Sequence, residues 1–135
     1  MRSSDPLVET IARACAGLVV ASETDSDVTP VVFHVPRGTS IDCEVVLALA
    51  GHDPATRCDG VSLHEFFEPL GRRRAWHDRQ DAEMAQGFRR LERLLRRRLD
   101  EPRVFRIGDR SIEVLVLGRA RDGRVVGVRT SAVET

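Results

Sequence analysis

Apolar residues in the first half of the chain recur at helical spacing in three places. We expect helices over about 6–18 and 40–49, and a short one from Ser62 to Gly71. Each begins behind a residue that can act as an N-cap and ends near a glycine. The expected caps are Asp5 (followed by Pro6), Thr39 or Ser40, and Ser62, the last within a Ser-x-x-Glu capping box.

The second half opens with the strongest periodic signal in the sequence. Between 79 and 99, apolar residues repeat at steps of four, three, four and four, namely Met84, Phe88, Leu91, Leu95 and Leu99. This spacing places them on one face of a long amphipathic helix, for which Asp78 is a suitable N-cap.

β-branched and apolar runs separated by turn signals dominate the rest of the chain. We expect strands over 104–107, 112–117 and 125–130, joined at Gly108-Asp109 and Asp122-Gly123. An earlier run, 28–35, contains Pro30 and predicts a strand that lies at a sheet edge. The pattern therefore predicts a single α+β domain over 1–135, a meander of three strands plus the earlier strand, covered by helices.

Charge is unevenly distributed although the net charge is zero. Residues 1–68 hold 4 arginines against 11 acidic residues, and residues 69–135 hold 17 against 10. The halves thus carry −7 and +7. Such a split can steer a charged partner, but attraction between two halves of one fold is the simpler interpretation.

The cysteines and the amino terminus bear on the cellular compartment. Cys15, Cys43 and Cys58 are odd in number and widely spaced, which favours a reduced chain in the cytoplasm. The first residues resemble no secretion signal, and no run of 18 apolar residues exists that could span a membrane. We expect no membrane association.

Known catalytic and metal-binding motifs are missing from the sequence. His52, Cys58 and His64 are the densest group of candidate ligands, but their spacing matches no zinc pattern. The sequence also lacks GxSxG, HExxH, Walker A and GxGxxG motifs. We therefore expect neither an enzyme nor a metal or other cofactor of its own.

Arginines gather on the long helix and just before it. Six lie between Arg89 and Arg98, and Arg72-Arg73-Arg74 precede them. A nucleic-acid-binding protein needs such a concentration for phosphate contacts, but base stacking would depend on Trp76 and Phe105 alone. We favour a solvated helix face over direct binding of nucleic acid.

Two features fit a hydrophobic core poorly. Trp76 lies between arginines and the polar stretch His77-Asp78-Arg79, outside any apolar periodicity. It is either a wedge against the long helix or an exposed anchor for a partner protein, the role in which tryptophan is most enriched. The second feature is the short polar end of the chain, 130–135, of a kind that usually frays.

Several of these segments, in this order, resemble the bacterial nuclease A inhibitor family. The resemblance runs over nearly the whole chain and ends at the same Glu-Thr. It is carried by Ser22-Glu23, Leu49-Ala50-Gly51-His52, Phe66-Phe67, Trp76, Val104 to Gly108, Ile112 to Gly118, Gly127 to Thr130 and Val133-Glu134-Thr135.

The resemblance implies an α-β-α sandwich with a central, largely antiparallel sheet and a C-terminal β-meander. It also implies an inhibitor that binds a sugar-nonspecific, metal-dependent DNA/RNA endonuclease and occludes its active-site cleft. The implied contact residues are Glu23, Trp76 and Thr135, to which we add Glu134 and Arg74, and Thr135 would approach the nuclease's metal ion. An acidic loop and a terminal carboxylate are suited to imitate phosphate in a cationic cleft.

The chain departs from the family's pattern around the expected contacts. The family places an acidic residue before this tryptophan and an aromatic residue after it, where this chain has Ala75 and His77. Asp25-Ser26-Asp27 also stands where the family has an aromatic residue. The nuclease bound is therefore left open, and the free protein is expected to be a monomer. The alternative function is an arginine-rich module that contacts nucleic acid or an acidic protein partner.

Overall fold

The computed structural model describes residues 5–134, which form four helices and seven strands. Five strands make one antiparallel sheet in the order β3-β7-β6-β5-β4, and two short strands, β1 and β2, pair separately. The strands are β1 Val19–Val20, β2 Ser26–Asp27, β3 Thr29–Phe33, β4 Cys58–Val61, β5 Asp100–Ile107, β6 Ser111–Arg119 and β7 Val125–Val133.

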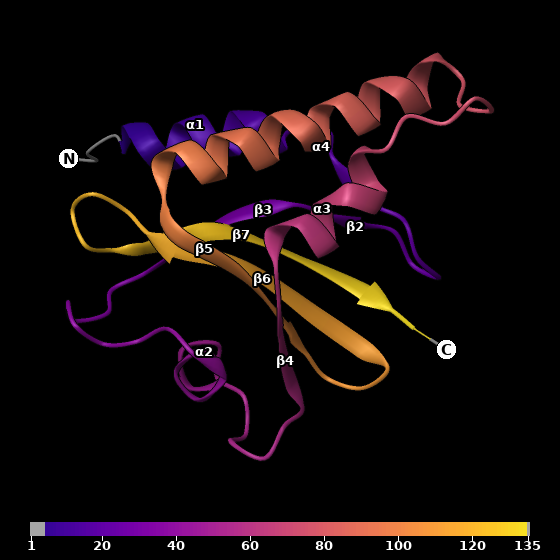
Figure 1. Ribbon diagram of the computed structural model, residues 1–135. Helices are drawn as coiled ribbons and strands as arrows, with labels where there is room; N and C mark the ends of the chain where they lie inside the picture. Colours follow the sequence, from indigo (N-terminus) through magenta and orange to yellow (C-terminus); the bar gives the residue numbers. More distant parts are fainter. Residues whose placement is uncertain (1–4, 135) are drawn as a thin grey trace.

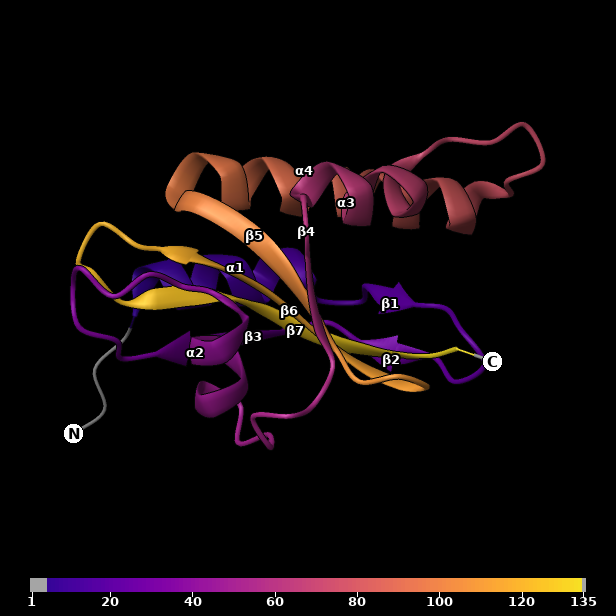
Figure 2. The same ribbon diagram turned by 60° about the horizontal axis from the view of Figure 1, so that its bottom comes forward.

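The helices cover both faces of the sheet (Figures 1 and 2). Three of them, α1 (Pro6–Cys15), α3 (Leu63–Gly71) and α4 (Arg79–Arg98), pack on one face, and α2 (Cys43–Leu49) packs on the other. The predicted α-β-α sandwich is therefore confirmed.

Side-chain alternation along the strands divides the core into two layers. On β6, Val114 and Val116 face the three-helix layer, while Leu115 and Leu117 face α2. Consecutive side chains of a strand point to opposite faces, so one strand with apolar residues at nearly every position can serve both layers. β6 lies in the middle of the sheet, and its residues from Val114 to Leu117 are all buried.

The C-terminal meander forms as predicted, with longer strands. The glycines of its two turns, Gly108 and Gly123, have φ angles of 112° and 93°, which residues other than glycine rarely adopt. The early strand, β3, pairs only with β7 and lies at the sheet edge, as Pro30 predicted. β7 continues to Val133, which pairs with Ser111 of β6, so the chain does not fray at residue 130.

Helix boundaries follow local capping chemistry. Asp5, Ser62 and Asp78 cap α1, α3 and α4 as predicted, and Asp78 forms a reciprocal capping box with Asp81. The first helix ends at Cys15 rather than near 18, because Ala16 leaves the helical conformation and Gly17 takes a φ of 80°.

The start of α2 was predicted wrongly. The helix begins at Cys43 behind Asp42, whose carboxylate accepts from the Val45 amide at 3.0 Å, and not behind Thr39 or Ser40. Residues 35–39 are held outside the helix because the Arg119 guanidinium donates to the carbonyls of Val35, Pro36 and Thr39 at 2.7–2.9 Å.

Two further expectations were wrong. Strand β4 was missed because its four residues show no apolar alternation, and it forms by pairing with β5. The expectation of reduced cysteines fails as well, since Cys43 and Cys58 form a disulfide with their Cα atoms 5.8 Å apart. These cysteines lie 15 residues apart in sequence but side by side at the junction of α2 and β4. Within residues 5–134, no helix has both the length and the apolar character needed to cross a membrane.

Candidate protein interface

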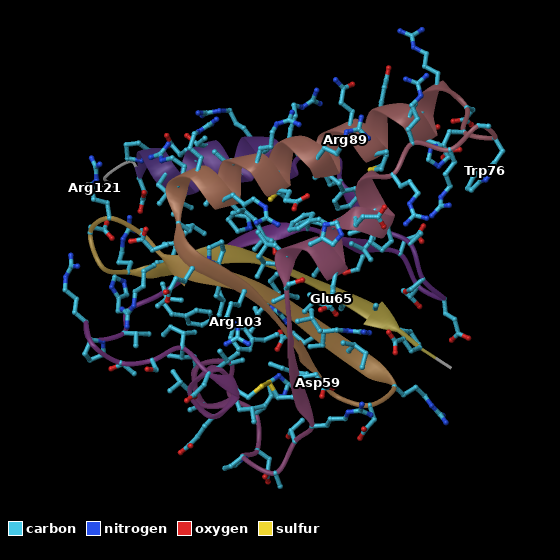
Figure 3. The ribbon with its side chains drawn as sticks, viewed as in Figure 1. Asp59, Glu65, Trp76, Arg89, Arg103 and Arg121 are labelled. Carbon is cyan, nitrogen blue, oxygen red and sulfur yellow. A yellow bond between two sulfur atoms is a disulfide. The ribbon has the colours of Figure 1, made fainter. Side chains whose placement is uncertain are left out.

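Trp76 is largely exposed on the tryptophan loop, the segment 72–78 that joins α3 to α4. Its side chain is 74% exposed, the one large apolar side chain so exposed among residues 5–134. The alternative of a wedge packed against the long helix is therefore wrong. In Figure 3 the indole is seen at the far end of the molecule, beyond the start of α4.

Short-range contacts give the tryptophan loop a defined shape. The Arg74 amide donates to Nδ1 of His77 at 3.3 Å, and the His77 amide donates to the Arg74 carbonyl at 3.1 Å. The imidazole of His77 meets the indole edge to face at 4.6 Å, and the Arg74 guanidinium carbon lies 5.9 Å from the indole centroid. His77 thus supplies a ring beside Trp76.

The two ends of this loop are anchored on helices. At its start, the Arg89 guanidinium of α4 donates to the Gly71 carbonyl at the end of α3. The approach is close enough that a Cβ at Gly71 would lie 2.8 Å from Cγ of Arg89. Arg72 also pairs with Glu68 on α3, which holds the pKa of that carboxyl below its usual value. At the other end, the Asp78 capping box fixes the first turn of α4.

Glu23 lies in the acidic loop, residues 21–25, which connects β1 to β2. Its side chain is exposed, and no basic group within residues 5–134 forms an ion pair with it. The loop is nevertheless ordered by Ser22, whose hydroxyl accepts from the Thr24 amide at 3.3 Å and donates to the Thr24 carbonyl at 2.7 Å. Glu23 is therefore available to a partner and is carried on a defined turn.

The carboxyl-terminal edge, residues 131–134, runs along the acidic loop. The Val133 amide donates to the Ser22 hydroxyl at 3.1 Å, and the Ser131 amide donates to the Ser26 hydroxyl at the same distance. Glu134 is exposed, but its carboxylate pairs with Arg106 of β5 and its amide donates to the Arg110 carbonyl at 2.8 Å. Glu134 thus holds the tail in place. Thr135 lies outside the described residues.

Three segments far apart in sequence lie at one end of the sandwich. Figures 1 and 2 both show the tryptophan loop, the β1–β2 hairpin and the carboxyl-terminal end of β7 at the same end of the molecule. That end presents an exposed indole and an unpaired carboxylate on supported backbone. Exposed aromatic anchors and complementary charge are the features that protein–protein binding sites use.

Five of the six arginines between Arg89 and Arg98 are exposed, as predicted, whereas Arg89 is half-buried and binds the Gly71 carbonyl. Arg90, Arg93 and Arg97 are exposed at steps of three and four, and none pairs with an acidic group within residues 5–134. Arg96 instead pairs with Glu92 at 2.9 Å. The stripe follows the outer side of α4 opposite its buried residues, away from the tryptophan loop.

Two of the three candidate metal ligands are engaged in separate contacts. Cys58 is in the disulfide, and His52 contacts Glu113 at 2.7 Å, whose other carboxylate oxygen forms an ion pair with Arg129 at 2.5 Å. Within residues 5–134, no three His, Cys, Asp or Glu side chains are grouped as a metal site. Burial raises the pKa of the Cys15 thiol to about 11, which keeps it protonated and unreactive at neutral pH.

A surface hollow of about 730 Å³ lies between the start of α3 and β5. It is lined by Ser62, Glu65, Arg96 and Arg103 among others, and Figure 3 shows Glu65 and Arg103 on this side of the molecule. The Ser62 hydroxyl is used as the cap of α3, where it accepts from the Glu65 amide at 3.1 Å. The hollow is open and lies apart from the tryptophan loop.

Sequence reasoning identified the exposed residues and missed those that support them. Ser22, Ser26 and His77 hold the candidate contacts in place, but serine in a polar loop is ordinary turn composition. The partners of the two serines, Val133 and Ser131, are visible only once β7 lies beside the hairpin.

Comparison with known proteins identifies the family of the chain. Among curated proteins, no sequence matches the chain. The sequence profile of the family described as nuclease A inhibitor-like protein matches residues 5–135, which is nearly the entire chain and includes all three segments of the interface. The chain therefore belongs to the nuclease A inhibitor-like family.

Proposed function

We propose that this protein inhibits a sugar-nonspecific, metal-dependent DNA/RNA endonuclease by occluding its active-site cleft with the end of the sandwich that carries Trp76. Membership of the inhibitor-like family supports inhibition of a nuclease. The observation that carries the rest is the 74% exposure of Trp76 at the end where the acidic loop and the carboxyl-terminal edge also lie.

Each group has a role that its chemistry suits. Trp76 fills an apolar pocket on the nuclease surface, and Glu23 pairs with a cationic side chain of the cleft. Thr135 approaches the nuclease's metal ion, where its hydroxyl replaces a phosphate oxygen. Arg74 orders the indole and contacts the rim, while Glu134 orients the tail through Arg106.

The test is a titration of inhibitor against such a nuclease, with duplex DNA and RNA as substrates. Inhibition at one-to-one stoichiometry on both substrates is the expected result. Trp76→Ala, Glu23→Ala and removal of Glu134-Thr135 should each weaken inhibition, and Ser40→Ala, an exposed change next to α2, should not. Full inhibition after removal of the last two residues would contradict the metal-site role.

The arginine stripe on α4 supports a second candidate function. Arg90, Arg93 and Arg97 stand unpaired on one face, an arrangement that phosphates or an acidic protein can contact. Phosphate binding weakens log-linearly with salt concentration. A gel shift of duplex DNA at about 150 mM salt, with nucleases unaffected, would favour this function over inhibition.

The remaining expectations form part of the same proposal. The protein is a monomer when free, has no catalytic activity of its own and acts in the cytoplasm. Cell fractionation with detection of the protein in each fraction tests the compartment. Recovery of the protein outside the cytoplasmic fraction would argue against the cytoplasm.

A further inference from the structure

The β1–β2 hairpin is joined to the main sheet by side chains. Strand β3 pairs with β7 only as far as Thr29 opposite Arg129, so within residues 5–134 no strand forms backbone pairs with the next stretch of that β7 edge, although the hairpin lies beside it. Two amides along this stretch, those of Ser131 and Val133, donate to the hydroxyls of Ser26 and Ser22, each at 3.1 Å. The serine hydroxyls accept the amide hydrogen bonds that the backbone carbonyls of a paired strand would otherwise accept.

Ser22 stands at the centre of this junction. Its hydroxyl oxygen contacts the Val133 amide at 3.1 Å and both the amide and the carbonyl of Thr24, at 3.3 and 2.7 Å. The first contact belongs to the carboxyl-terminal edge and the other two shape the turn that bears Glu23. One atom therefore connects the acidic loop with the end of the chain.

Resting on the proposed function, we propose that Ser22 is a positioning residue that fixes Glu23 and the carboxyl-terminal edge relative to each other, so that both meet the nuclease as one preformed surface. Ser22 itself need not touch the nuclease. A loop and a tail that are ordered before binding lose less conformational entropy on binding, and affinity rises accordingly.

The two sides of the carboxyl-terminal edge are supported differently. On the side of β6, the Glu134 amide donates to the Arg110 carbonyl at 2.8 Å and its carboxylate pairs with Arg106. On the hairpin side, the contacts are those of Ser22 and Ser26, the latter including a hydroxyl-to-hydroxyl bond to Ser131 at 2.8 Å. Loss of the Ser22 hydroxyl therefore frees the acidic loop from Val133, while Ser26 still joins β2 to Ser131 and the tail stays on β6.

The primary test compares Ser22→Ala with Ser22→Thr, which keeps the hydroxyl, and with Ser40→Ala as a matched control. We expect Ser22→Ala to weaken nuclease binding about tenfold, in line with the loss of several hydrogen bonds and of preformed order. Ser22→Thr should stay within about threefold of the parent protein, because its hydroxyl can make the same bonds. Equal affinities of Ser22→Ala and the parent protein would overturn the inference.

A double-mutant cycle separates positioning from a general effect on folding. The effects of Ser22→Ala and Glu23→Ala on nuclease affinity should be non-additive. A Glu23 carboxylate already displaced by Ser22→Ala contributes less binding energy for Glu23→Ala to remove. Ser22→Ala and Trp76→Ala should be additive, since the tryptophan loop is anchored on α3 and α4 instead. Additivity in the first pair would contradict the inference while leaving the nuclease-inhibitor function intact.

A third measurement needs no nuclease. Hydrogen exchange at the Val133 amide should accelerate at least about tenfold in Ser22→Ala and remain slow in Ser22→Thr. Unchanged exchange in Ser22→Ala would show that the Ser22 hydroxyl does not hold the Val133 amide, whatever the protein binds. If Ser22→Ala fails to fold, Ser22→Cys takes its place, because sulfur is a weak acceptor of similar size. Failure of the parent protein to inhibit any nuclease would refute the proposed function. The exchange result would still decide whether Ser22 holds the acidic loop to the carboxyl-terminal edge.

Discussion

Replacing Trp76 by alanine tests the interface at the residue on which it most depends. The indole is 74% exposed and contacts its neighbours through the His77 ring and the Arg74 guanidinium. Its removal therefore takes away surface that a partner would cover and leaves the core intact. The free energy of unfolding should change by less than about 0.5 kcal/mol.

The expected loss of affinity follows from the exposed area. A tryptophan side chain contributes up to about 250 Å² on burial, so an indole exposed to this degree offers roughly 150 Å² of apolar surface to a pocket. At about 25 cal/mol per Å² this is worth ~4 kcal/mol, from which immobilising the side chain subtracts about 1 kcal/mol. We therefore expect Trp76→Ala to cost about 3 kcal/mol, or roughly a hundredfold in Kd.

The assay is calorimetric titration of the nuclease with each inhibitor, supported by inhibition curves on duplex DNA. Gln80→Ala, an exposed change four residues away on the first turn of α4, is the matched control and should bind like the parent protein. Trp76→Phe should fall between the two, because a smaller ring fills less of the pocket.

Two results would refute this reasoning. A Trp76→Ala protein that binds the nuclease with parental affinity would show that the indole lies outside the interface. A loss of affinity accompanied by a fall in the free energy of unfolding of more than about 1 kcal/mol would show that Trp76 stabilises the fold. The second outcome would contradict its exposure.

Three further predictions concern stability. Thr130→Val should raise the free energy of unfolding by about 1 kcal/mol in chemical denaturation, because the buried Thr130 hydroxyl has no hydrogen-bond partner within residues 5–134; a loss would contradict this. Cys58→Ser should lower it by about 3 kcal/mol under oxidising conditions, as expected for a 15-residue loop, and by much less with reductant present. The hydrogen bond from Arg124 lowers the pKa of Asp5 from 3.8, so its stabilising contribution is complete above the unfolded-state pKa and is lost as pH falls through the folded-state pKa. Asp5→Asn should therefore destabilise the protein at pH 7 and not near pH 2, as measured by thermal unfolding; an equal deficit at both pH values would argue against the ion pair.

The sequence predicted elements whose signal is local. The long helix follows from a repeat of apolar residues, and the meander from β-branched runs between glycine turns. The predicted N-cap was correct where a single local residue determines the start of the helix, as Asp78 does for α4. It failed at α2, because Arg119, about 80 residues away, binds the carbonyls of residues 35–39 and delays the helix to Cys43.

The candidate site was predicted unevenly for the same physical reason. Trp76 was identified as a poor fit to any core, and its exposure confirms that interpretation. The disulfide and the contact of Ser22 with Val133 join residues from different elements of the fold, so neither spacing nor composition could indicate them. Exposure can be read from a periodic pattern, whereas contacts across strands depend on register, which only the folded sheet sets.

The two halves of the interface are supported by different layers of the sandwich. The tryptophan loop is fixed by α3 and α4, through the bond from Arg89 to the Gly71 carbonyl and the Asp78 cap. The acidic loop and the tail are fixed by β7 and its neighbours. The distance between Trp76 and Glu23 is therefore set by how α4 packs on the sheet, a core in which Leu91 and Leu95 are fully buried. Under the proposed function, a nuclease that accepts the indole and the carboxylate together would be selected by the packing of the core as much as by either side chain, because close-packed interiors resist small shifts.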